Sequence, residues 1–127
     1  MPILSEADLV TARLRGREIA SILRFSSSEL TLIATAISEV TRNILSYAGS
    51  GELRLRLVQQ GQKRGVVIVA HDSGPGIADL ASAMRDGYST SGSLGLGLPG
   101  SRRLMDEFEI ASEVGKGTTV MMTKWKI

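Results

Sequence analysis

An acid and an amide, Glu39 and Asn43, lie four residues apart in a segment whose apolar pattern predicts a helix. Residues at this spacing share one face, which is turned away from the apolar stripe of Ile33, Ile37 and Ile44, so we expect neither in the core. An amide oxygen suits a hard cation such as Mg²⁺, and a glutamate one turn away can accept a proton from an attacking hydroxyl. Taken alone, the spacing also fits a solvated helix face.

Asp72 follows an apolar run and is itself followed by Ser-Gly-Pro-Gly, which includes Gly74 and Gly76. An acid at the end of a strand can accept a hydrogen bond from the amino group of adenine, and glycines let the backbone approach the base. The same residue types are common in plain turns. We leave the neighbouring His71 out of the chemistry, because a strand histidine that points to the other face is more often structural.

A glycine-rich stretch, residues 92–97, opens onto a segment predicted to be a helix that runs to about Glu107. Exposed backbone N–H groups at a helix start suit a polyphosphate. The stretch is not a Walker loop and no strand immediately precedes it, so neither that loop nor a dinucleotide fold is supported. A flexible connector would have a similar composition. Together, however, the three motifs predict a nucleotide site.

The composition is that of an ordinary globular protein. The 127 residues predict a single domain, residues 1–127, with 43% hydrophobic and 22% charged residues. Scattered basic residues, a net charge of +2 and an aromatic content of 4% speak against nucleic-acid binding. No apolar run approaches the ~18 residues that span a bilayer, and the N-terminus lacks a basic-then-apolar leader. The absence of cysteine excludes disulfides and fits a reducing compartment, so we expect a cytoplasmic protein without membrane partners.

The elements that must position these motifs follow from the periodicity. The expected helices are residues 8–23, 26–48, 78–86 and 98–107, and the expected strands are 52–59, 65–71, 110–114 and 118–126, with a short strand near Ile3. Such an order places the helices on one face of a mixed, mainly antiparallel sheet. The fold class is therefore predicted to be an α/β two-layer sandwich.

In this order the motifs resemble those of the Bergerat-fold ATPase and kinase superfamily. Residues 39–43 resemble its N box, residues 72–76 its first glycine box, residues 92–97 its second glycine box, and Gly117-Thr118 its closing threonine motif. The nearest branch is that of the anti-sigma-factor serine kinases, since the domain here stands alone. Within that branch, the segments Tyr88–Gly100 and Arg103–Phe108 are similar to the switch kinases of the stressosome.

The resemblance implies ATP and Mg²⁺ as cofactors and gives each motif a role. Asp72 would bind the adenine amino group, assisted through water by Thr118. Asn43 would coordinate Mg²⁺, and Glu39 would be the catalytic base. Backbone amides would hold the phosphates under a lid formed by residues 87–94. The residues expected to bind ATP are Asn43, Asp72, Gly74, Gly76, Ile77, Gly92, Gly95, Leu96, Gly97, Leu98 and Thr118.

One departure from the superfamily concerns the γ-phosphate. Some relatives place a basic residue just before the second-box glycines, whereas this chain has Ser91, Gly92 and Ser93 there. Charge neutralisation would then depend on Mg²⁺, with Arg42 or Arg102 as further candidates.

Two functions from different classes follow from the resemblance. The first is an ATP-dependent protein serine/threonine kinase that phosphorylates STAS-domain scaffold proteins and then activates a metal-dependent type 2C phosphatase. The second is a non-catalytic regulatory module that binds nucleotide and sequesters or activates a partner. A histidine-kinase catalytic fragment is a weaker third interpretation, because no pair of dimerisation helices precedes the domain and His71 lies at a strand end.

Overall fold

The structure, a computed structural model, describes residues 1–76 and 97–126. Its elements follow the predicted order, and the short strand at Ile3 is present. The predicted helix 78–86 and the lid 87–94 lie outside the described residues. The elements are β1 (Pro2–Ile3), α1 (Glu6–Ser21), α2 (Ser27–Tyr47), β2 (Gly51–Gln60), β3 (Lys63–Asp72), α4 (Gly97–Leu104), β4 (Glu107–Glu113) and β5 (Gly117–Lys126).

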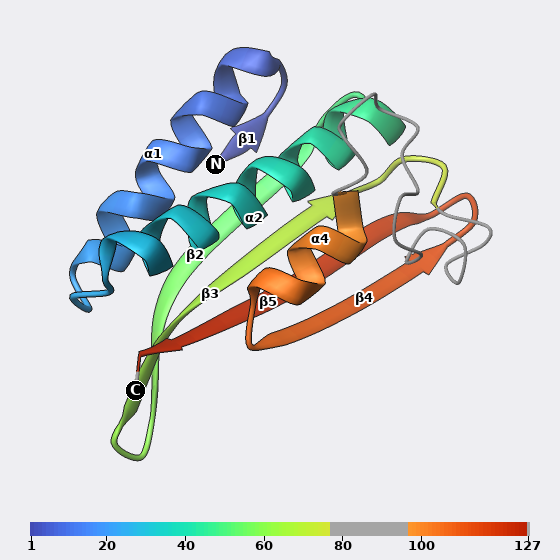
Figure 1. Cartoon of the computed structure of the whole chain (residues 1–127). Coiled ribbons are helices and arrows are strands. Elements are labelled where there is room, and N and C mark those ends of the chain that lie inside the picture. Colours follow the sequence, from blue (N-terminus) through green and yellow to red (C-terminus); the bar gives the residue numbers. More distant parts are fainter. Residues whose placement is uncertain (77–96, 127) are drawn as a thin grey trace.

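The strands form one five-stranded sheet in the order β1-β2-β3-β5-β4, and every neighbouring pair in it is antiparallel. The helices α1, α2 and α4 lie on the same side of this sheet (Figure 1). The predicted two-layer sandwich is therefore confirmed, and the sheet contains no parallel pair among the described strands. β3 lies in the middle of the sheet and carries Asp72 at its end.

The long helix α2 has clear sequence reasons to begin where it does. The Ser26 hydroxyl accepts a hydrogen bond from the Glu29 amide at 3.1 Å, and the Glu29 carboxylate accepts one from the Ser26 amide at 2.9 Å. This capping box satisfies two backbone donors that the first turn would otherwise leave free. The helix ends at Tyr47, and Gly49 follows with a φ of +81°, a conformation that glycine adopts without strain.

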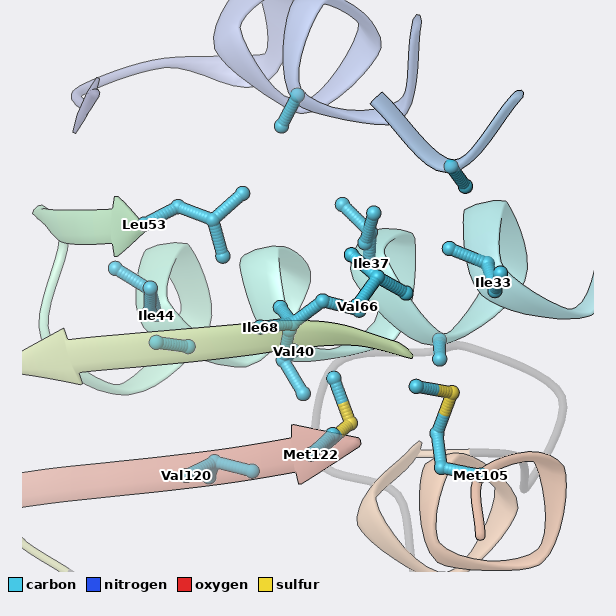
Figure 2. Packing of buried hydrophobic residues seen from close by; sticks show 14 of the residues in the cluster. Ile33, Ile37, Val40, Ile44, Leu53, Val66, Ile68, Met105, Val120 and Met122 are labelled. Atoms are coloured by element: carbon cyan, nitrogen blue, oxygen red, sulfur yellow. The ribbon is translucent and has the colours of Figure 1, made fainter. Parts of the chain in front are cut away.

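The core lies between α2 and the sheet (Figure 2). Alternate residues of β3, Val66 and Ile68 among them, point toward the helices and are fully buried. They meet Ile33 and Ile37 of α2, which have no exposed surface, and Met122 of β5. Burying a side chain of this size stabilises the fold by about 1.5–3 kcal/mol. The core therefore fixes the rotation of α2 about its axis, and with it the positions of Glu39 and Asn43.

The third described helix is shorter than predicted. α4 ends at Leu104, whereas the predicted helix runs to residue 107, and the next residue, Phe108, belongs to β4 and pairs with Met122. The cause is Asp106, whose carboxylate accepts a hydrogen bond from the Trp125 amide at 2.7 Å and so ties the chain to β5. Phe108 thus fits the apolar spacing of either a helix or a strand.

No helix in the described part of the chain combines the length and the apolar character that crossing a membrane requires.

A candidate nucleotide site at the end of the central strand

Three of the predicted site residues come together around one small cavity. Asn43 of α2, Asp72 of β3 and Thr118 of β5 all line it, beside Tyr47. The cavity has a volume of about 20 Å³, close to the space of a single water molecule. A cavity of this size cannot hold a nucleotide base, so a base at this place would have to lie above the described walls. A larger cavity of about 590 Å³ between α1 and β2 contains none of the predicted site residues.

Asp72 is buried and accepts a hydrogen bond from the loop that follows it. Its side chain is on the helix face of the sheet, and the residue is only 7% exposed. One carboxylate oxygen, Oδ1, accepts a hydrogen bond from the Gly74 amide at 2.9 Å. Its register partner in β5 is Thr118, whose hydroxyl lies 2.8 Å from that of Ser112. The carboxylate is thus fixed and retains acceptor capacity for a donor such as an amino group.

His71 points the other way. It is exposed on the opposite face of the sheet, where its Nδ1 lies 2.8 Å from the Thr119 hydroxyl. Leaving this histidine out of the nucleotide chemistry agrees with its position.

The glycines around Asp72 allow backbone contacts that a side chain would prevent. Gly76 has a φ of +77°, and a Cβ there would lie 2.3 Å from the Glu113 carbonyl oxygen. A Cβ on Gly74 would lie 2.5 Å from the Cβ of Ala48. Gly117 has a φ of +117°, and its Cβ would lie 2.0 Å from the Asp72 carbonyl oxygen. The loop after β3 is therefore packed between the end of α2 and the β4–β5 turn.

Glu39 corrects the expectation that it lies outside the core. The residue is only 5% exposed, and its Oε1 accepts a hydrogen bond from Nη1 of Arg42 at 2.9 Å. The helix rotation that points Ile37 into the core also turns this face of α2 inward. A buried carboxylate needs a partner, and Arg42 supplies it. Arg42, a candidate for meeting the γ-phosphate, is therefore engaged with the candidate base in this structure.

Asn43 has an unsatisfied side chain. Its Nδ2 is buried and has no hydrogen-bond partner among the described residues. Because the oxygen and nitrogen of an amide are assigned from their surroundings, a turned amide would direct the oxygen to the same place. Mg²⁺ keeps several waters and takes few protein ligands besides phosphate oxygens, and an orphan amide one helical turn from a carboxylate fits that chemistry.

The second glycine motif is described only at its end. Gly97 and Leu98 begin α4, which packs against α2. The other predicted residues of this region, Ile77, Gly92, Gly95 and Leu96, lie outside the described residues. The N-terminus of α4 thus comes from the segment that was predicted to hold phosphates.

Two residues of this site were missed in the sequence. Tyr47 lines the cavity four residues after Asn43, on the same helix face, and that spacing was the available signal. Ser112 lies opposite Thr118 in β4, so only the strand register reveals it.

The comparisons with known proteins define the class of this protein. The family of histidine kinase-like ATPase domains matches residues 4–124. A mycobacterial sensor histidine kinase, MprB, shares the fold with a TM-score of 0.55 at 16% identity, over 98% of this chain and 96% of that one. The chain therefore belongs to the histidine kinase-like ATPase domain family, which confirms the predicted resemblance.

Two curated relatives give the branch within the family. The serine/threonine-protein kinase RsbT of Bacillus subtilis is 49% identical over 97% of this chain and 92% of its own length. The anti-sigma F factor of Clostridium kluyveri is 30% identical over 89% of this chain and 82% of its own. The chain is accordingly an enzyme of the serine/threonine-protein kinase branch of the family.

Proposed function

We propose that this protein is an ATP-dependent serine/threonine kinase that acts on a separate protein. The observation that carries the proposal is the cavity where Asn43, Asp72 and Thr118 meet, one helical turn from the buried Glu39. The 49% identity to RsbT supports the reaction type. We place the protein in the cytoplasm, where ATP is available.

In this proposal each residue has a separate task. Asp72 accepts a hydrogen bond from the adenine amino group, and Thr118 supports the base beside it. Asn43 holds Mg²⁺, which on binding neutralises phosphate charge. Glu39 accepts the proton of the attacking hydroxyl, for which it must be released from Arg42 at least in part. Arg42, a candidate for meeting the γ-phosphate, would be available once its contact with Glu39 is broken.

Asp72→Asn tests the base site. The substitution keeps an oxygen for the Gly74 amide but removes the charge that strengthens a hydrogen bond to a base amino group. We expect the affinity for Mg-ADP to fall by about 1–3 kcal/mol, measured by calorimetry. The control is Glu18→Gln on the exposed surface of α1, which also removes one negative charge. Unchanged affinity in Asp72→Asn would remove this carboxylate from the base site.

Glu39→Gln tests the chemistry separately from binding. Loss of a general base lowers phosphotransfer by roughly 10²–10⁴-fold, and we expect the affinity for Mg-ATP to change little. The readout is transfer of labelled phosphate to a STAS-domain protein, with nucleotide affinity measured on the same sample. If binding and rate fall together, Glu39 is structural.

We further propose that the kinase exchanges partners. It would phosphorylate a STAS-domain scaffold protein, leave it, and then activate a type 2C phosphatase. Phosphorylation adds about −1.5 to −2 charges where the kinase docks, which disturbs the fit of the two surfaces. We expect at least about tenfold weaker binding to the phosphorylated scaffold by surface plasmon resonance, and equal affinity would contradict the exchange.

The competing candidate, a non-catalytic nucleotide-binding module, is favoured by the anti-sigma F relatives. It predicts that Glu39→Gln leaves partner regulation intact.

A further inference from the structure

The hairpin of β4 and β5 brings a serine hydroxyl, which the proposed function does not use, next to the candidate site. Ser112 of β4 and Thr118 of β5 are register partners, and their hydroxyl oxygens lie 2.8 Å apart. Thr118 is in turn the register partner of Asp72 in β3. The three side chains therefore form a row across three neighbouring strands, on the face of the sheet that carries the helices.

The hydroxyl hydrogen of Ser112 is already engaged. It is donated to the backbone carbonyl oxygen of Gly117, with 3.3 Å between the two oxygens. A serine hydroxyl has one hydrogen and two lone pairs, and a carbonyl oxygen can only accept. In the contact between the two hydroxyls, Thr118 is therefore the donor and Ser112 is the acceptor.

This order of donors decides what Thr118 offers to the cavity. Its hydrogen is directed to Ser112, so toward the cavity it presents lone pairs alone. Asp72 lines the same cavity with a carboxylate, which also only accepts. Register partners have their Cβ atoms about 4.5–5.5 Å apart, so both acceptors are within reach of one small group or one water molecule.

The cavity therefore requires hydrogen-bond donors. A bound group must supply hydrogens to these two oxygens, directly or through a water molecule, because a further acceptor there would leave buried polar atoms unpaired. An amino group has two N–H donors, whereas a carbonyl oxygen has none. Among purines, the site thus favours a 6-amino group over a 6-oxo group.

We propose that Ser112 is a positioning residue that fixes the Thr118 hydroxyl as an acceptor and thereby makes the site selective for a 6-amino purine. This inference rests on the proposed function, in which the base binds beside Asp72. The turn of the hairpin supports the arrangement, because the Gly115 amide donates a hydrogen bond to the Pro75 carbonyl at 2.8 Å and ties the hairpin to the loop after β3. Without the Ser112 hydroxyl, the Thr118 hydroxyl can turn and donate toward the cavity.

Calorimetry with three nucleotides tests the proposal. They are the Mg²⁺ complexes of ADP, of inosine diphosphate, which has a 6-oxo group, and of purine riboside diphosphate, which carries only hydrogen at that carbon. We expect the unmodified chain to bind ADP at least about tenfold more tightly than either analogue, as for the loss of one hydrogen bond to a charged group.

Ser112→Ala should weaken ADP binding by about two- to tenfold and leave the affinity for purine riboside diphosphate unchanged. It should strengthen the binding of inosine diphosphate, because a released Thr118 hydroxyl can donate to a 6-oxo group. Damage to the fold would instead weaken all three nucleotides together. Ser112→Thr, which keeps a hydroxyl at this half-buried strand position, should restore the preference for ADP. In a Thr118→Val background, Ser112→Ala should change no affinity, because it acts through that hydroxyl.

The matched control is Thr119→Val. This neighbouring hydroxyl of β5 also has a partner, since it lies 2.8 Å from Nδ1 of His71, but it is on the opposite face of the sheet. Its loss should leave all three affinities unchanged.

The outcomes separate this inference from the proposed function. If the unmodified chain binds ADP and purine riboside diphosphate equally well, the base does not bind beside Asp72, and both the base site and the role of Ser112 are wrong. If the unmodified chain discriminates and Ser112→Ala discriminates just as strongly, the base site stands and the role of Ser112 is wrong. Equal losses for all three nucleotides in both Ser112→Ala and Ser112→Thr would likewise overturn the positioning role.

Discussion

At the scale of single residues, the closest backbone contact in the described part of the site is between Gly117 and Asp72. Substituting Gly117 by alanine would place a Cβ 2.0 Å from a backbone oxygen that cannot move aside without disturbing the β3–β5 pairing. We expect Gly117→Ala to lower the free energy of unfolding by at least about 2 kcal/mol, and to weaken Mg-ADP binding because Asp72 is displaced. The measurements are urea unfolding and calorimetry.

The control for this prediction is Gly61→Ala. Gly61 also has a positive φ, +63°, but a Cβ there meets nothing within 4 Å. Gly61→Ala should lower the free energy of unfolding only by the about 1–2 kcal/mol that a left-handed backbone conformation costs a residue with a Cβ. Its affinity for Mg-ADP should be unchanged. Equal losses of unfolding free energy at the two positions would show that the close approach of Gly117 to Asp72 does not contribute to stability.

The same scale shows what the sequence could predict about the site. Asp72 and Asn43 were identifiable because each residue type is unusual for its position, an acid ending an apolar strand and an amide within a helix. The burial of Glu39 was not identifiable, since it depends on the packing of α2 against the sheet and on the ion pair with Arg42. The roles of Asp72, Asn43 and Glu39 stay predictions, as do those of Ile77, Gly92, Gly95 and Leu96.

At the scale of elements, α1 and α2 approach each other through a glycine. A Cβ on Gly16 would lie 2.1 Å from Cδ1 of Ile37, a side chain with no exposed surface. We expect Gly16→Ala to destabilise the protein, because overpacking costs about 1–3 kcal/mol and exceeds the gain in helix propensity. The measurement is thermal and urea unfolding.

Ile37→Val provides the matched background for this test. It removes the Cδ1 atom, so Gly16→Ala should become stabilising there, by about 0.5–1 kcal/mol from helix propensity. A double-mutant cycle without this change of sign would mean that the helices move apart at little cost.

The start of α2 makes stability depend on pH. The hydrogen bond from the Ser26 backbone amide lowers the pKa of Glu29 below its ordinary value of 4.5. A lowered pKa in the folded state means that the contribution is present above the ordinary value and is lost as the pH falls through the folded value. We expect Glu29→Gln to flatten the pH dependence of unfolding in that acidic range and to leave the shape above it unchanged. An unaltered pH profile would contradict this assignment.

Element order followed from periodicity because α2 and β3 are long and strongly patterned. The boundary between α4 and β4 was wrong for a tertiary reason. The contacts of Asp106 with β5 decide it, and no local pattern contains that information. The pairing order of the strands likewise depends on contacts between segments far apart in the chain.

At the scale of the whole molecule, the two faces of the sheet differ in what packs on them. The covered face carries the core and the candidate nucleotide site, whereas no described helix lies on the other face. The short β4–β5 turn is the exception, since Gly115 donates a hydrogen bond to the Pro75 carbonyl at 2.8 Å and so contacts the site loop.

The position of Trp125 has a spectroscopic consequence. It is the only tryptophan of the chain, its ring lies against Gly65 on the face opposite the site, and the Lys63 ammonium is 5.1 Å from the ring centroid. Its emission should therefore shift when a partner covers this face and displaces lysine or solvent from the ring, and should respond little to nucleotide. Tyr47, at the site, would be the chromophore that senses the nucleotide. The chain thus carries two optical reporters, one for each face of its sheet.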